Sequence, residues 1–152
     1  MERRQVLKRL DDAWQAFQES YAGLSVSQIM EPGVTGAWSV RDILAHVTTW
    51  EEEALKYLPV ILRGGKTTRY SVAYGGIDAF NALMTERKKS LPLAEVLRQQ
   101  EETHRRLIAY VERAPEAALR SETRFRRRLR CDTYSHYPIH AAAIRTWREG
   151  RA

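Results

Sequence analysis

Apolar side chains recur every three or four residues along four long stretches of this sequence, with charged residues between them. In the first stretch they are Val6, Leu7, Leu10, Ala13, Trp14, Phe17 and Tyr21. This spacing brings apolar residues to one face of an α-helix, whereas a half-buried strand would alternate apolar and polar residues. No segment shows a convincing alternation. The chain is therefore predicted to be all-α.

The second stretch follows a loop marked by glycine and proline, and its start is well defined. Ser39 is followed three residues later by Asp42, which resembles a capping box with aspartate in the usual glutamate position. The apolar positions are Val40, Ile43, Leu44, Val47, Trp50, Ala54, Tyr57 and Leu58. We expect this helix to end or kink at Pro59, ahead of Gly64 and Gly65.

Two further long helices are predicted beyond a glycine-rich connection. Residues 64–76 form this connection, which leads to a short helical run over residues 77–89. Ser90 and Pro92 mark the start of the third long helix. The last helix is predicted from about residue 132 to Trp147. Four long amphipathic helices in 152 residues, with a long connection between the second and third, indicate a four-helix bundle.

Length and composition limit the class of protein further. A chain of 152 residues, 43% hydrophobic and 29% charged, suffices for one domain with a real core and predicts a single domain over residues 1–152. No apolar run approaches the roughly 18 residues of a membrane span, so we expect no membrane partner. The N-terminus has no apolar secretory segment, and the single Cys131 cannot form an internal disulfide. These features predict a cytoplasmic protein.

The basic charge of the chain is concentrated in one segment. The net charge is +6, and residues 120–130 contain six arginines against one glutamate, which gives this segment +5. It could be a solvated surface, a phosphate-binding patch or a rim that attracts anionic substrate. Phe125 and Leu129, four residues apart, indicate that part of it packs against the bundle. Because no nucleic-acid recognition motif accompanies the arginines, we expect no sequence-specific nucleic-acid binding.

Three of the four histidines occupy positions that could hold a metal ion. His46 lies on the inward face of the second helix, and His136 and His140 are four residues apart in the last helix. That spacing places two imidazoles on one helical face, where they can share an ion. Three nitrogen ligands would leave a coordination position open for water or substrate. The alternative for each histidine is hydrogen-bonded packing.

Aromatic residues and a fourth histidine are candidates for the lining of the same pocket. Trp50, Tyr57, Tyr134 and Tyr137 would surround the three histidines if the bundle forms as predicted, although aromatic residues at helical spacing commonly belong to a core. His104 lies on or beside the apolar stripe of the third helix and could face this cavity. Its alternative is a boundary position with a packed ring and a hydrated edge.

Two sequence segments resemble a known family. The segment GAWSVRDILAHV, residues 36–47, followed by Trp50 and Glu51, resembles the signature of the DinB-like superfamily. The segment DTYSHYPIH, residues 132–140, is similar to the closing helix of its ClbS/DfsB branch. The resemblance implies an up-up-down-down four-helix bundle, a homodimer, and a metal triad at the positions of His46, His136 and His140. Pro138 departs from the pattern, and it is tolerated only if the last helix begins near Ser135.

The same resemblance implies a function. The branch includes a resistance protein that opens a reactive cyclopropane in a genotoxin by hydrolysis, and the wider superfamily includes metal- and thiol-dependent transferases. We therefore expect a small-molecule enzyme with one divalent ion, zinc or nickel, or with the three histidines acting as general base and acid without metal. The competing hypothesis is a non-enzymatic protein that sequesters a reactive compound or contacts nucleic acid through its arginines.

Overall fold

The structure, a computed structural model, describes residues 2–151. Its helices are α1 (Glu2–Tyr21), α2 (Val26–Met30), α3 (Val40–Leu62), α4 (Tyr70–Ala73), α5 (Ile77–Lys88), α6 (Leu93–Arg113), the 3-10 helix η1 (Glu116–Leu119), α7 (Arg124–Asp132) and α8 (Tyr137–Glu149). Over this range the β-type pairing is limited to an isolated bridge between Thr35 and Trp38. The prediction of an all-α chain is confirmed. None of the helices within residues 2–151 is long and apolar enough to cross a membrane.

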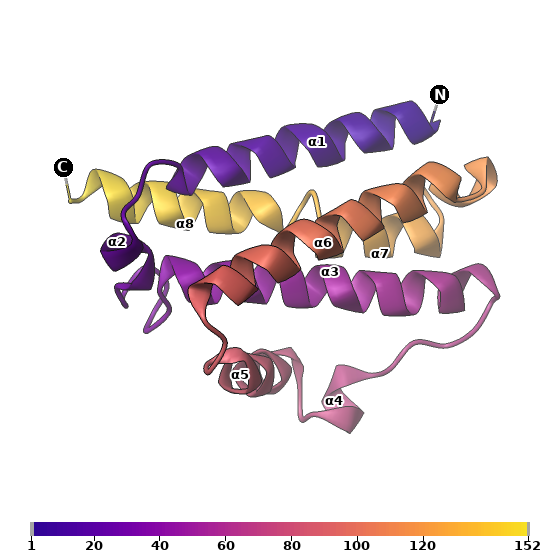
Figure 1. Ribbon diagram of the computed structural model, residues 1–152. Coiled ribbons are helices and arrows are strands. Elements are labelled where there is room, and N and C mark those ends of the chain that lie inside the picture. The colour runs from indigo at the N-terminus through magenta and orange to yellow at the C-terminus, as the bar shows by residue number, and fades with distance from the viewer. Residues whose placement is uncertain (1, 152) are drawn as a thin grey trace.

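Four helical rows run side by side: α1, α3, α6, and the row formed by α7 and α8 (Figure 1). Glu116, just beyond the end of α6, pairs with Arg3 at the start of α1 at 3.0 Å. Gln100 near the start of α6 donates to Tyr21 at the end of α1 at 2.7 Å, so these two helices are antiparallel. Residues 63–92 return the chain to the same end of the bundle, which makes α3 and α6 parallel. The order is therefore up-down-down-up, and the up-up-down-down order implied by the resemblance is corrected.

The second long helix does not end at its proline. α3 continues through Pro59 to Leu62, and the amide of Arg63 still donates to the Pro59 carbonyl at 3.2 Å. Proline lacks a donor but keeps an acceptor, so one proline near the end of a helix removes only one backbone bond there. The turn is made instead at Gly64, whose φ of +78° favours glycine. The expected end at Pro59 was wrong.

The predicted last helix is divided into two helices. Asp132 ends α7, and Thr133 leaves the helical region with φ −132° and ψ −98°. Pro138 lies in the first turn of α8, where its missing N–H would have had no helical acceptor. In one continuous helix, the ring of Pro138 would clash with the carbonyl of Tyr134. The expected start near Asp132 is corrected, because Pro138 requires the break.

The core lies between the four rows and consists of their inward faces. Its fully buried apolar side chains include Val6, Leu10, Phe17, Ile43, Leu44, Val47, Leu58, Leu107, Val111, Leu129 and Ile144. Outside these rows, α5 is fastened to α3 by the buried guanidinium of Arg41. This group donates to the carbonyl oxygens of Lys88 at 2.5 Å and Leu91 at 2.7 Å. The connection between α3 and α6 is therefore held against the bundle.

Two leucines on α6 test this assignment of the core. Leu107 is fully buried, whereas Leu97 is 40% exposed. We expect Leu107→Ala to lower the free energy of unfolding by about 3 kcal/mol, because it leaves a cavity in the core. The matched Leu97→Ala change should cost less than about 1 kcal/mol. Urea unfolding monitored by circular dichroism measures both, and equal losses would contradict the assigned orientation of α6.

Candidate metal centre

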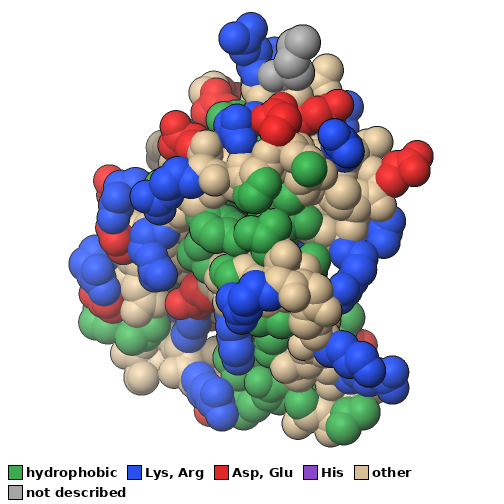
Figure 2. All heavy atoms as spheres, turned by 90° about the vertical axis from the view of Figure 1, so that its right-hand side faces the viewer, with side chains coloured by type: hydrophobic (Ala, Val, Ile, Leu, Met, Phe, Trp, Pro, Cys, Tyr) green, Lys and Arg blue, Asp and Glu red, His purple; other side chains and the backbone are tan. Residues whose placement is uncertain are grey.

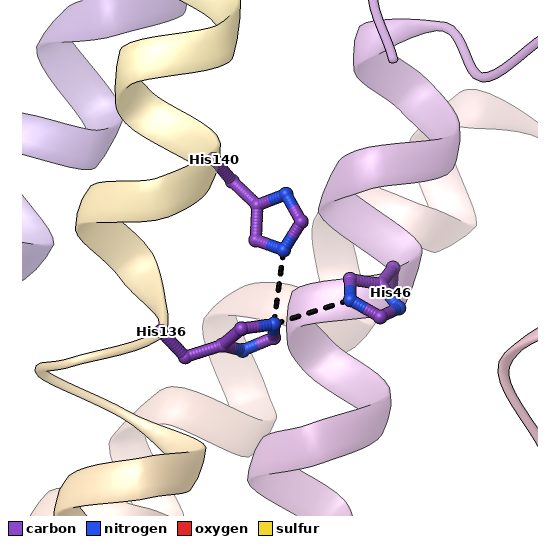
Figure 3. Close-up of side chains that lie close together, drawn as sticks. All are labelled: His46, His136 and His140. Carbon is purple, nitrogen blue, oxygen red and sulfur yellow. Dashed lines mark hydrogen bonds between the residues drawn. The ribbon is translucent and has the colours of Figure 1, made fainter. Parts of the chain in front are cut away.

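The side chains of His46, His136 and His140 converge between α3 and the start of α8 (Figure 3). The Nε2 atoms of His46 and His136 are 3.1 Å apart, and those of His136 and His140 are 2.9 Å apart. One ligand atom from each histidine lies within 4.8 Å of the others. The predicted convergence of the three histidines is therefore present in the structure.

Local backbone features bring these histidines together. The start of α3 is fixed by the predicted capping box: the Asp42 amide donates to the Ser39 hydroxyl at 3.1 Å, and the Ser39 amide donates to the Asp42 carboxylate at 3.1 Å. His46 follows one turn later. His136 occupies the N-cap position of α8, and its amide donates to the Thr133 carbonyl at 2.8 Å. Because α8 begins here, His140 lies one turn beyond His136 on the same face.

Burial keeps the three imidazoles neutral. His46 and His140 are 7% and 8% exposed, and His136 is half-buried. Desolvation lowers the pKa of His46 to about 2, with repulsion from the other two histidines and Lys88 contributing. Desolvation also lowers the pKa of His136 to about 3 and that of His140 to about 4. All three imidazoles are therefore uncharged at neutral pH, which is the state that binds metal ions.

The donor set fits a divalent transition metal, because neutral imidazoles suit zinc, copper, iron and nickel. Zinc–nitrogen bonds of about 2.0–2.1 Å in a tetrahedral site separate the ligand nitrogens by roughly 3.4 Å, so the present contacts would open by a few tenths of an ångström. His136 Nδ1 is buried and has no hydrogen-bond partner within residues 2–151. The outer hydrogen bond that usually orients a metal-binding histidine is thus missing at this ligand.

Aromatic rings and α5 enclose the histidines. The Trp38 ring lies 4.7 Å from the His46 ring, and the Trp50 ring lies 6.5 Å from the His136 ring. On the α5 side, a crevice beside His46 that Met84 and Lys88 help to line has no room for a water molecule. A small molecule could reach His46 through this crevice only if α5 moved.

The other aromatic candidates have different partners. Trp50 lies beside the histidines, as predicted. The Tyr57 hydroxyl donates to Thr68 at 2.5 Å, and the Tyr134 hydroxyl accepts from Arg126 at 3.2 Å. Neither tyrosine makes a hydrogen bond or ring contact with the three histidines within the described chain.

His104 and Tyr137 meet at the buried carboxylate of Glu51, a residue of the family-like segment for which the sequence predicted no role. The Tyr137 hydroxyl donates to Glu51 Oε2 at 2.5 Å, and His104 Nδ1 donates to the same oxygen at 2.7 Å. The His104 ring also stacks on Trp14 with centroids 3.7 Å apart. Burial and the Glu51 charge raise the pKa of Tyr137 well above its ordinary value, so the phenol keeps its proton. The position of Glu51, four residues after Val47, was the available signal.

A second polar cluster lies farther along α3 and was also missed. Arg128 donates to the Asp132 carboxylate at 2.6 Å and to the Tyr70 hydroxyl at 2.8 Å. The Tyr70 hydroxyl donates to Glu53 at 2.9 Å. Burial raises the pKa of Asp132 to about 6, although Arg128 opposes the shift. The spacing of four between Arg128 and Asp132 was the sequence signal for this pair.

The arginine segment divides into inward and outward side chains. Phe125 and Leu129 are buried, which confirms that part of the segment packs against the bundle. Arg126 is buried and donates to the Leu119 carbonyl at 2.9 Å, and Arg128 belongs to the cluster described above. The exposed arginines of the segment are Arg120, Arg124, Arg127 and Arg130. The basic surface is therefore smaller than the sequence count indicates.

Two solved structures share this fold. One is the colibactin self-resistance protein ClbS in complex with a double-stranded DNA, with 15% sequence identity, a TM-score of 0.80, and coverage of 95% of this chain and 93% of that one. The other is the sibling lethal factor precursor DfsB, with 15% identity, a TM-score of 0.81, and coverage of 98% and 96%. No curated protein matches the sequence.

The ClbS complex overturns one expectation. The absence of a recognition motif predicted no sequence-specific nucleic-acid binding, yet a protein of this fold is found with double-stranded DNA. The motif argument failed because contacts to phosphate require only exposed cations and backbone donors. Nucleic acid therefore has to be considered as a partner.

The sequence itself gives the family assignment. Residues 9–137 match the profile of the DinB superfamily, which covers most of the chain, including α3 and the arginine segment. The resemblance of the first segment to the DinB-like superfamily is thereby confirmed. The chain belongs to the DinB superfamily.

Proposed function

We propose that this protein is a small-molecule enzyme that uses a divalent metal ion, zinc or nickel, held by His46, His136 and His140. The convergence of three neutral, largely buried imidazoles carries this proposal. The reaction we favour is a hydrolysis that protects against a reactive or genotoxic metabolite. The structural similarity to ClbS, a self-resistance protein, supports this choice.

The residues around the site would have distinct roles in such a reaction. The three histidines would present uncharged nitrogens to the ion, and the rings of Trp38 and Trp50 lie beside His46 and His136, where they would help to exclude bulk water. When bound, the ion would act as a Lewis acid that activates water or a thiol for attack on the substrate. In a metal-free reaction, the same imidazoles would have to serve as general base and general acid, but with pKa values of about 2, 3 and 4 they are weak bases that carry almost no ionisable proton at neutral pH, which favours the metal-dependent reaction.

Two alternative functions, a transferase and a sequestering protein, would use the same site without hydrolysing the compound. A metal- and thiol-dependent transferase would consume a thiol cosubstrate, whereas a sequestering protein would bind its compound without turnover. Incubation of the protein with a strained electrophile, with and without thiol, separates the three by their products. Hydrolysed product requires the hydrolase, a thioether requires the transferase, and stoichiometric retention of unchanged compound indicates sequestration.

Contact with double-stranded DNA is a second candidate function. The DNA complex of ClbS favours it, and four exposed arginines are available in and before α7. Figure 2 shows the end of the bundle where α6, η1 and the start of α7 meet, with Lys and Arg side chains, and Asp and Glu side chains among them, around an apolar centre. Such a distribution suits contacts to phosphates better than readout of bases.

Removal of single histidines tests the metal site. We expect His46→Ala, His136→Ala and His140→Ala each to abolish stoichiometric zinc or nickel while leaving the helix content unchanged. Pro138→Ala, in the same turn as His136 but without a ligand, should retain the metal because the proline lies in the first turn of α8. Metal analysis of protein purified without a histidine tag measures the metal content of all four variants, and circular dichroism measures their helix content. Wild-type protein that stays metal-free after exposure to zinc, nickel, manganese and iron would refute the metalloenzyme.

The lowered pKa values of the histidines predict an unusual pH dependence of metal affinity. Since the pKa values are about 2, 3 and 4, the ligands stay neutral at mildly acidic pH and metal binding displaces almost no protons. Three ordinary imidazoles would lose about 30-fold in affinity between about pH 7 and pH 6, whereas we expect a loss below about threefold. Calorimetric titrations in buffers of different ionisation enthalpy report the protons released. Release of two or more protons at pH 6 would contradict the burial of the site.

The exposed arginines predict salt-dependent binding to duplex DNA. Replacement of Arg120, Arg124, Arg127 and Arg130 by Ala should weaken binding and reduce the salt slope of the association constant by about 1 for each phosphate that is no longer neutralised. Arg9→Ala, an exposed arginine of α1, is the matched control. Fluorescence anisotropy at several salt concentrations measures the slope. An unchanged salt slope in the variant that lacks all four arginines would show that this surface does not contact DNA.

A further inference from the structure

Glu51 occupies a core position that apolar residues normally hold. It follows Leu44 and Val47 on the inward stripe of α3 and precedes Ala54 and Leu58, and all four neighbours are fully buried. The exposure of Glu51 itself is also 0%. A buried carboxylate is costly unless it is paired, so its presence in this stripe calls for a partner.

The partners of Glu51 come from the other rows of the bundle. Oε2 accepts hydrogen bonds from Tyr137 of α8 and His104 of α6, and the His104 ring stacks on Trp14 of α1. Oε1 is buried and has no hydrogen-bond partner within the described chain. An apolar residue would fill this layer without leaving an unpaired oxygen, so stability alone does not account for Glu51.

Tyr137 connects this layer to the candidate metal centre. It is the first residue of α8, directly follows His136, and lies three residues before His140. The break after α7 means that α7 does not set the orientation of α8 through a continuous helix (Figure 3). Within residues 2–151, two side-chain hydrogen bonds join this first turn to α3: the His136–His46 contact and the Tyr137–Glu51 bond.

We infer that Glu51 is a positioning residue for the histidine site, acting through Tyr137 on His136 and His140. His136 lacks an outer hydrogen bond of its own, since its Nδ1 has no partner in the described chain. The neighbouring Tyr137 supplies the missing constraint by tying the backbone of that turn to α3. This inference deepens the proposed metal site and rests on it.

The test compares isosteric and apolar changes at the two bonded residues. Tyr137→Phe removes only the hydroxyl, Glu51→Leu removes the acceptor, and Glu51→Gln keeps an oxygen that can accept from Tyr137. Zinc affinity is measured by chelator competition on the full chain. We expect Tyr137→Phe and Glu51→Leu each to lower the affinity by about 10-fold, the lower end of the loss that follows removal of a group bonded directly to a ligand, because the Tyr137–Glu51 bond acts on His136 through the backbone. Glu51→Gln should remain within about threefold of wild type.

A second measurement reports the arrangement of the three imidazoles in metal-free protein. Long-range proton–nitrogen correlation spectra of metal-free protein report the tautomers and the Nε2 contacts of the three histidines directly. We expect the His136 and His140 signals to change in Tyr137→Phe and Glu51→Leu and to be preserved in Glu51→Gln. The control is Leu119→Ala, which opens a cavity at a fully buried core position in η1 and should leave both the spectra and the affinity unchanged.

The outcomes separate positioning from a purely structural role. Wild-type spectra and affinity in Tyr137→Phe would overturn the inference, and so would equal losses in Leu119→Ala or in Glu51→Gln. If Glu51→Leu does not fold, the isosteric Tyr137→Phe decides. If wild-type protein binds none of zinc, nickel, manganese and iron, the proposed metal function fails, and the imidazole spectra alone decide whether Glu51 positions the histidines.

Discussion

A carboxylate with no exposure to solvent, hydrogen-bonded by a tyrosine and a histidine, lies where the rows of this bundle meet. The desolvation of an unpaired carboxylate costs several kcal/mol, so Glu51 is stable in the core only when Tyr137 and His104 reach it together. That requirement fixes how far α8 and α6 are shifted along their axes relative to α3. The stacking of Trp14 on His104 fixes the position of α1 in the same way. Apolar side chains pack in several registers, whereas these hydrogen bonds form in only one.

The candidate metal centre depends on that register and on one proline. Pro138 forces a break between α7 and α8, and the break places His136 at a helix start with His140 one turn away. His46 meets them from α3, which runs antiparallel to α8. Burial then lowers the pKa of all three, so the site is formed from uncharged donors before any ion arrives. Fold and chemistry are thus linked through the same few residues.

Periodicity predicted the helices because an amphipathic stripe is a local property of the chain. The i, i+4 spacing of His136 and His140 likewise identified their shared face, and the apolar stripe of the second helix marked His46 as inward. Helix direction was not predictable in this way, since a stripe has the same appearance whichever way its helix runs. No role was predicted for Glu51 because a glutamate is ordinarily a surface residue, and only the partners from α6 and α8 show why it can be buried.

The fastening of α5 has a kinetic consequence. Arg41 donates to the carbonyl of Lys88 at the end of this helix and to that of Leu91 just beyond it, and Trp50 donates to Asn81 within the helix at 2.9 Å. With the crevice beside His46 closed to water, a small molecule arriving from that side must wait for these bonds to break. Along this route, entry would then depend on how often α5 moves away from α3 rather than on how often the molecule collides with the protein. A saturating, concentration-independent association rate is the signature of such a gate.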